Sequence, residues 1–237
     1  MNTATSAASM DVATDEIDQL LRQWINDGRH VVHEADSKRL LAKAGFVVPG
    51  NSGDGPAVVK LCADQALHKS ELGLVILNVD PENIESARRD LRQRSSQAGV
   101  GDGEILIESM VGDVLLEWFV GCRTDATFGP VVVVGVGGIY AELLGAPEIR
   151  MAPVSTRDAE LALRNHKAFP IIDGARGKEP ADIAAFARLI ADISEFFYRR
   201  SHLIAELDLN PIMVRSRSMA PGLVIADASI ILQRQSF

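Results

Sequence analysis

Apolar and polar residues follow two different spacings along this chain, and the change from one to the other predicts a mixed α/β protein. Apolar residues that recur every three or four positions predict helices, which we expect over residues 14–28, 34–44, 80–98, 155–168 and 180–200. Short apolar runs bounded by turn residues predict strands over residues 46–48, 57–61, 72–79, 104–109, 114–121, 130–136, 139–144, 149–152, 204–211 and 224–230.

Strands become denser from residue 104 onward, and this change in texture predicts where the chain divides. We expect a disordered lead-in over residues 1–13, a small N-terminal lobe over 14–103 and a larger C-terminal lobe over 104–237.

Composition and charge exclude several classes of protein. Of the 237 residues 47% are apolar and 24% are charged, which is ordinary for a globular protein. The net charge of −8 argues against nucleic acid as a partner, because phosphate backbones are bound by clustered Lys and Arg. The apolar stretches are too short to cross a membrane, and residues 1–18 lack the pattern of a secretory signal. We therefore expect a cytoplasmic protein that binds no membrane.

The richest group of polar side chains lies near the C-terminus. Glu206, Asp208 and Asn210 occupy alternate positions, so in an extended strand they share one face, and Asp227 follows on the next predicted strand. Hard oxygen atoms grouped at the end of a sheet suit Mg²⁺ that also binds a nucleotide phosphate. A half-exposed hairpin with solvated acids is the alternative interpretation.

These residues also carry a resemblance. Residues 205–212, followed by Ala-Asp-Ala at 226–228, resemble the metal-binding end of ATP-grasp proteins and are similar to the nucleotide-binding β subunit of ADP-forming acyl-CoA synthetases, relatives of succinyl-CoA synthetase. Further matching motifs occur in the expected order at residues 28–29, 37–38, 45–49, 59–61, 68–70, 128–130, 137–140, 150–153, 170–177 and 180–183. The similarity covers nearly the whole chain after residue 14.

The resemblance implies an ATP-grasp fold, in which two lobes hold a magnesium–nucleotide complex between them. It implies the reaction acyl-CoA + ADP + phosphate ⇌ carboxylic acid + CoA + ATP, with ATP/ADP and Mg²⁺ as cofactors. No CoA-binding domain is recognisable in the sequence, so the resemblance also implies a separate CoA-binding α subunit in an α₂β₂ assembly.

The resemblance assigns roles to particular residues. Lys60 is expected to contact the nucleotide phosphates, and Glu108 and Glu117 to lie near adenine and ribose, with the backbone of the connector at Met110 reading the base. Asn210 and Asp227 are expected to bind Mg²⁺, with Asp208 and Glu206 nearby. A solvated lysine near a strand end is the alternative for Lys60.

A histidine in the loop Ala63–Glu71 is the candidate for covalent chemistry. In the family that this chain resembles, the His-Lys-Ser loop is thought to carry phosphate between the partner subunit and ADP, which makes His68 the expected catalytic residue. Imidazole suits this role because it is a neutral nucleophile near pH 7 and a good leaving group when phosphorylated. A solvated loop histidine is the alternative.

Two features separate the competing interpretations of the whole chain. The run Gly135-Val-Gly-Gly138 lacks the spacing of a dinucleotide-binding fingerprint, so we expect a tight turn that lets backbone approach a phosphate or a partner. Only a short turn separates Val48 from Ala57, where relatives carry an extra helix, so the small lobe is expected to be shortened. The shortened lobe motivates the alternative of a non-catalytic nucleotide-binding or structural subunit that stabilises a CoA-ligase partner. A third interpretation, a carboxylate–amine ligase, is disfavoured because the histidine loop would have no function in such an enzyme.

Overall fold

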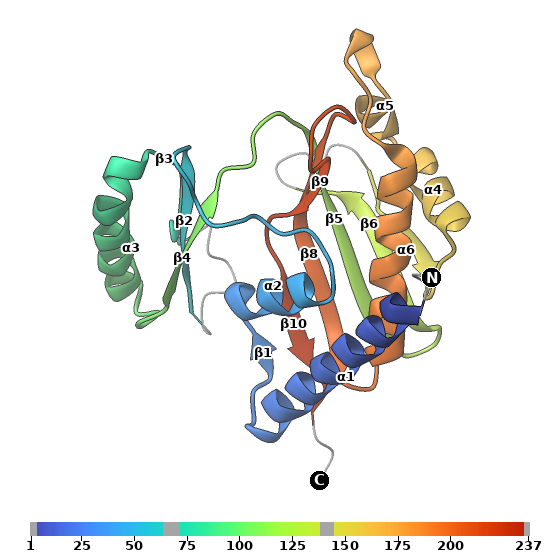
Figure 1. The fold of residues 1–237 in the computed structure, drawn as a ribbon, viewed down its shortest axis with the longest axis horizontal. Coiled ribbons are helices and arrows are strands. Elements are labelled where there is room, and N and C mark those ends of the chain that lie inside the picture. The colour runs from blue at the N-terminus through green and yellow to red at the C-terminus, as the bar shows by residue number, and fades with distance from the viewer. Residues whose placement is uncertain (1–3, 64–71, 138–144, 235–237) are drawn as a thin grey trace.

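The chain folds into two lobes, each built on its own antiparallel sheet (Figure 1). The computed structural model describes residues 4–63, 72–137 and 145–234. The smaller sheet has the order β3 (Val75–Val79), β2 (Ala57–Cys62), β4 (Glu104–Ser109). After the short turn η1 (Pro81–Asn83), the helix α3 (Ile84–Ala98) packs on β2 and β3 and closes the second, smaller core. The predicted α/β class is confirmed.

The larger sheet is formed by strands from both ends of the chain. Its order is β1 (Val31–Val32), β10 (Ser229–Leu232), β8 (Ile204–Arg215), β5 (Val114–Asp125), β6 (Gly129–Val136), β7 (Glu148–Met151), with β9 (Leu223–Ile225) also paired to β8. Every pairing between its strands is antiparallel.

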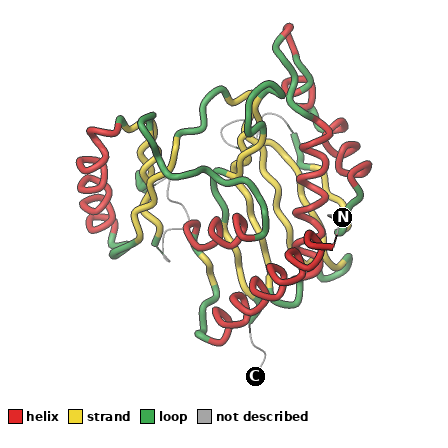
Figure 2. The backbone as a smooth tube through the Cα atoms, in the orientation of Figure 1, coloured by secondary structure: helices red, strands yellow, loops and turns green. Residues whose placement is uncertain are grey.

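Helices cover one side of the large sheet (Figure 2). They are α1 (Ala4–Asn26), α2 (Glu34–Lys43), α4 (Thr156–Asn165), α5 (Phe169–Ile172) and α6 (Ile183–Arg200), with the turn η3 (Ala175–Gly177) between the last two. The main hydrophobic core lies between these helices and the inward side chains of β5, β6, β8 and β10. None of the described helices is long and apolar enough to pass through a bilayer.

Local signals in the sequence account for the helix boundaries. Ser155 caps α4 by accepting a hydrogen bond from the Asp158 amide, as in a capping box. Asp182 does the same for α6 by accepting from the Ala185 amide. The buried side chains of α6 recur at helical spacing and include Phe186, Ile190, Ile193 and Phe197. Gly99 ends α3 in the left-handed conformation, with φ of 69°.

Several boundary predictions were wrong. The helix α1 begins at Ala4, whereas a disordered lead-in was expected over residues 1–13. Residues 46–48 form no strand, and β3 begins at Val75 rather than residue 72. The strand expected over residues 139–144 lies outside the described residues.

The division at residue 103 was also wrong, because tertiary pairing overrides the order along the chain. The strand β4, placed by that division in the larger lobe, pairs with β2 of the smaller sheet. The N-terminal strand β1 pairs instead with β10 near the C-terminus. The segment from α1 to α2 therefore belongs to the larger lobe.

The connection from α2 to β2 is a loop, as the expected shortening of the small lobe requires. This loop lies along the end of β4, where the Ser109 amide donates to the Gly50 carbonyl at 2.9 Å. The Met110 amide donates to the Pro56 carbonyl at 2.9 Å. These two hydrogen bonds hold the connecting loop against the end of β4, where the chain leaves the small sheet.

Candidate functional site

The large sheet has an open face opposite its helices, and the predicted acids of β8 lie there. Glu206, Asp208 and Asn210 are exposed, while Leu207 and Leu209 between them are buried in the core. The predicted alternation is therefore confirmed. When polar residues occupy alternate positions of a strand, their side chains all lie on the face that is turned away from the hydrophobic core.

A β-bulge determines where this alternation ends. Trp118 of β5 pairs with Ile212 of β8, and Val120 pairs with Leu209, so Asn210 and Pro211 together lie opposite the single residue Phe119. Beyond the bulge the buried positions of β8 change from odd to even residue numbers. Asn210 is therefore the last residue of the alternating polar run, and it lies in the bulge.

The link between β9 and β10 brings Asp227 alongside Asn210. The Asn210 amide donates to the Asp227 carbonyl at 3.2 Å, and the Ala226 amide donates to the Pro211 carbonyl at 2.9 Å. Two residues that are 17 positions apart in the sequence are thus joined through their backbones. The prediction that the second run lies beside the first is confirmed by these bonds and by the pairing of Ser229 with Asp208.

The carboxylates on this face repel one another through their charges. Partial desolvation raises the pKa of Asp208 above its ordinary value, and the charges of Asp227 and then Glu206 raise it further. The shift means that the deprotonated form of Asp208 lacks compensating positive charge. A cation bound between these acids would supply it.

A glycine gives the Asn210 side chain its space. A Cβ atom added to Gly137 would lie 2.8 Å from Asn210 Oδ1, closer than real Cβ contacts allow. The Gly137 amide donates to the Glu117 carbonyl at 2.9 Å and so keeps the end of β6 beside β5. The expected approach of this backbone to a phosphate or a partner stays a prediction: Gly138 lies outside the described residues, and the close neighbour of Gly137 is the side chain of Asn210.

The oxygen atoms at this site suit Mg²⁺, which needs few protein ligands, better than a metal that is coordinated entirely by protein side chains. Among the residues that the structure describes, no three His, Cys, Asp or Glu side chains converge as a metal cluster. Mg²⁺ characteristically takes only one or two carboxylates together with phosphate oxygens and water. Asp227 and the amide oxygen of Asn210, with Asp208 beside them, offer that kind of partial set.

A second group of charged residues is buried between the lobes. Lys60 of β2 and Glu108 of β4 come from the small sheet, and Glu34 and Lys38 come from the first turns of α2. Each is less than a tenth exposed, with relative exposures of 7%, 5%, 2% and 3% respectively. We call these four residues the charge tetrad.

Both lysines of the charge tetrad contact the same three groups. The Lys60 ammonium lies 2.5 Å from Glu34 Oε1, 2.8 Å from the Ala226 carbonyl oxygen and 3.5 Å from Glu108 Oε2. The Lys38 ammonium lies 3.1 Å from Glu34 Oε1 and 3.0 Å from the Ala226 carbonyl oxygen, and it also pairs with Glu108. Because Ala226 precedes Asp227, the charge tetrad touches the link that holds the predicted metal ligand.

Lys60 remains protonated in this setting. Burial alone would lower its pKa, but the charges of Glu34, Asp227 and Glu108 and the hydrogen bond to Glu34 outweigh the burial and raise it. A permanently charged ammonium next to the link that carries Asp227 is suited to neutralising phosphate.

The structure changes the expected setting of the nucleotide-binding residues. The alternative of a solvated lysine near a strand end is wrong for Lys60, which is buried while β2 continues to Cys62. The Glu108 carboxylate faces Lys38 and Lys60. The backbone amide of Met110 donates to the Pro56 carbonyl, and the Met110 side chain is exposed. Glu117 is half-buried on β5, between the connector and Gly137.

Two members of the charge tetrad were missed as site residues. Glu34 and Lys38 lie four positions apart at the start of a helix, a spacing that places both on one face. This spacing was a usable signal, but it is also typical of solvated helix pairs. His68, the expected catalytic residue, lies outside the described residues.

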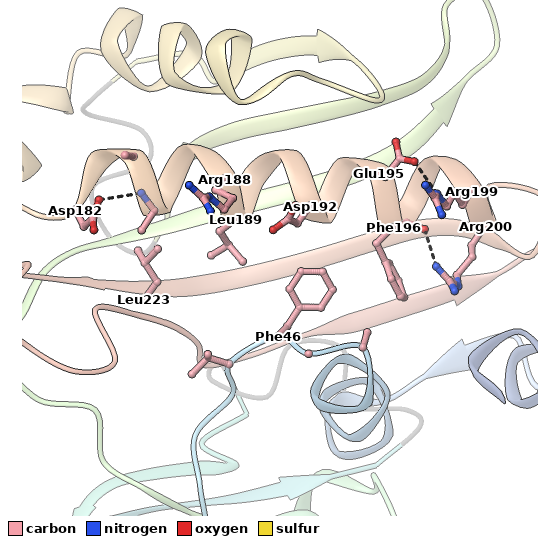
Figure 3. A pocket seen from close by; sticks show the side chains of 15 residues that line it. Phe46, Asp182, Arg188, Leu189, Asp192, Glu195, Phe196, Arg199, Arg200 and Leu223 are labelled. Carbon is pink, nitrogen blue, oxygen red and sulfur yellow. Dashed lines mark hydrogen bonds and ion pairs between the residues drawn. The ribbon is translucent and has the colours of Figure 1, made fainter. Parts of the chain in front are cut away.

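Two cavities flank different parts of the molecule. One, of about 510 Å³, lies between α2 and β4 and is lined in part by Lys38 and Glu108. The other, of about 750 Å³, lies between α6 and residues 44–47, where Phe46 faces Phe196 at a ring distance of 5.7 Å (Figure 3). The larger cavity is lined by no residue predicted for the site.

Comparison with known proteins places this arrangement in a family. Residues 51–232 match the sequence model of the ATP-grasp domain. The chain is 30% identical over 233 residues to subunit beta of ADP-forming acetate–CoA ligase II from Pyrococcus furiosus, covering 91% of this chain and 97% of that subunit. It is 34% identical over 181 residues to ADP-forming acetate–CoA ligase I from Archaeoglobus fulgidus, covering 75% of this chain but only 25% of that longer protein.

Solved structures agree with the sequence comparison. The PH1788 protein of Pyrococcus horikoshii superposes with a TM-score of 0.82 at 29% identity, covering 94% of this chain and all of that chain. A dinucleotide-forming acetyl-CoA synthetase 1 from Ca. Korarchaeum cryptofilum superposes with a TM-score of 0.77 at 27% identity, covering 92% of this chain and all of that chain. That synthetase was solved with coenzyme A and Mg-AMPPCP, with its phosphohistidine segment pointing towards the nucleotide-binding site.

Proposed function

The chain belongs to the ATP-grasp β subunits of the ADP-forming acetate–CoA ligases, and we propose that it binds magnesium–ADP and magnesium–ATP between its two lobes. The observation that carries this proposal is the meeting of two lobes at one backbone link. Lys60 from the small sheet bonds the Ala226 carbonyl at 2.8 Å, and the next residue, Asp227, is held beside Asn210. A cation for phosphate and oxygen ligands for a metal therefore converge from opposite sides.

In the proposed complex, the residues divide between phosphate, metal and nucleoside. Lys60 neutralises charge on the phosphates, and Asn210 and Asp227 hold the metal, with Asp208 and Glu206 completing the negative field around it. When bound, Mg²⁺ screens the charge of the transferring phosphoryl group, which is most of what a phosphoryl-transfer site must do.

The nucleoside end of the ligand belongs to β4, β5 and their connector. Glu117 accepts hydrogen bonds from the ribose hydroxyls, and the backbone around Met110 lies against the base. Glu108 shares its carboxylate with Lys38 and Lys60, and so sets the position of Lys60 from the small-lobe side. Together these residues orient the nucleotide in the proposed complex.

The reaction requires a second subunit in this proposal. The chain covers 97% of a Pyrococcus furiosus subunit beta, but only a quarter of the longer Archaeoglobus fulgidus ligase. In this proposal the CoA-binding part resides in a separate α subunit, in an α₂β₂ assembly in the cytoplasm, in line with the name of the Pyrococcus furiosus subunit beta. His68 carries phosphate between the two active sites, so that acyl-CoA, ADP and phosphate give acid, CoA and ATP. The phosphohistidine segment of the Ca. Korarchaeum cryptofilum synthetase supports this role.

Calorimetric titration with magnesium–ADP tests the proposal. The wild-type chain should bind, and Asp227→Ala should weaken binding at least tenfold, about 1.4 kcal/mol, because one metal ligand is lost. Asp192→Ala serves as the matched control, since this acid lines the cavity beside α6 and no part of the proposed site. A folded Asp227→Ala variant with wild-type affinity would contradict the metal assignment.

A further inference from the structure

The helix α2 connects the two lobes through buried ion pairs. It belongs to the larger lobe, because β1 just before it pairs with β10, yet its first turns face the small sheet (Figure 1). Glu34 and Lys38 of this helix reach Lys60 and Glu108 of the small sheet. Both helix residues lie outside the 51–232 segment that matches the ATP-grasp domain. The segment before that domain thus supplies half of the charge tetrad.

The contacts leave Lys60 little freedom to move. Its ammonium has three donors, and Glu34, Glu108 and the Ala226 carbonyl lie around it at 2.5 to 3.5 Å. The shortest of these contacts, to Glu34, comes from the helix and not from the small sheet. Glu34 therefore determines where the charge of Lys60 lies relative to Asp227.

The charge tetrad is balanced, with two ammonium and two carboxylate groups. Burying four charges is expensive, and well-packed apolar residues often stabilise such a place equally well. Stability alone is therefore a poor reason for this arrangement. A requirement that one of these ammonium groups be held at a fixed point explains it better.

We propose that Glu34 and Lys38 are positioning residues of the nucleotide site: Glu34 holds Lys60 toward the phosphates, and Lys38 holds Glu108 behind it. This inference rests on the proposed function. Neither residue touches nucleotide in this proposal; each acts through its partner in the small sheet. The N-terminal segment is then part of the site, and not only a cover for the large sheet.

A charge-balanced double variant tests the proposal directly. Glu34→Met/Lys38→Met removes one charge of each sign and retains apolar volume, while Lys60 can still pair with Glu108. Positioning predicts that magnesium–ADP binds at least tenfold more weakly at a temperature where the variant is folded. If the pair serves only stability, the thermal midpoint changes and the affinity of the folded protein does not.

Two further variants separate position from charge. Glu34→Gln keeps an oxygen acceptor for Lys60 but removes negative charge, so positioning predicts that this variant retains affinity within threefold. An electrostatic role predicts tighter binding for Glu34→Gln and no change for the double variant. Arg39→Met is the matched control, because Arg39 also links α2 to β4, through an exposed ion pair with Glu104, and should stay within twofold of wild type.

The outcomes also distinguish this inference from the proposed function. A wild-type chain that does not bind magnesium–ADP refutes the proposed function itself. Wild-type binding with equal affinity in the folded double variant refutes only the positioning role. If the double variant does not fold, Lys38→Met alone carries the test: a fivefold weakening supports the role, and unchanged affinity overturns it.

Discussion

Substitution of Gly137 by alanine should weaken metal-dependent nucleotide binding without touching any proposed ligand. An alanine Cβ at this position would lie 2.8 Å from Asn210 Oδ1, where ordinary contacts begin at 3.4 Å. The amide group must therefore move by about 0.6 Å, the difference between these distances. Backbone atoms of Trp118 lie at 3.6 and 3.7 Å, so they need not move.

The magnitude follows from the coordination of Mg²⁺. This ion requires near-octahedral geometry at about 2.0–2.1 Å, so a ligand displaced by about 0.6 Å contributes little. We expect Gly137→Ala to weaken magnesium–ADP binding at least tenfold, about 1.4 kcal/mol. Binding of ADP in the presence of a chelator should change less than threefold. Because the Asn210 side chain is exposed, the thermal midpoint should hardly change.

Gly121→Ala is the matched control. Gly121 lies on the same open face, but its added Cβ would be 3.8 Å from Asp208 Oδ1, an ordinary contact. Calorimetric titration of both variants, with and without Mg²⁺, measures the effect. Equal magnesium dependence in the wild type and in a folded Gly137→Ala variant would show that Asn210 does not bind the metal.

Three further predictions concern the histidines and the proposed partner subunit. His68→Ala should abolish acyl-CoA-dependent ATP formation in the reconstituted complex while ADP affinity stays nearly unchanged; substantial turnover would mean that phosphate passes directly to ADP. The purified chain alone should form no acyl-CoA from ATP, CoA and any acid, as measured by thioester detection, and product formation would contradict the need for a partner. Burial lowers the pKa of His166, and its Nδ1 accepts the Ala168 amide at 3.2 Å, so the neutral form is favoured in the folded protein. The contribution of His166 to the free energy of unfolding should therefore be fully present above the ordinary pKa of about 6.5, and it should be lost as the pH falls through the lowered pKa. His166→Asn should flatten this decline in denaturant unfolding below about pH 6.5, and an unchanged slope would assign the decline to other groups.

The periodicity of the sequence determined the elements and one face of the site. Strict alternation over residues 206–210 was enough to place three polar side chains together, because side chains in a strand alternate with period two whatever the partner strands are. The apolar face of α6 was predicted in the same way from its helical spacing, because that pattern is also local. The order of motifs then indicated the ATP-grasp family.

Only the tertiary structure decided which residues meet across long separations. Pairing of β1 with β10, and of β4 with β2, depends on contacts between distant segments, which no local pattern encodes. For the same reason the sequence placed Lys60 in solvent or at phosphate, but could not show that Glu34 holds it. A lysine and a glutamate 26 positions apart carry no mutual signal until folding brings them to 2.5 Å in a buried place, where each charge requires the other.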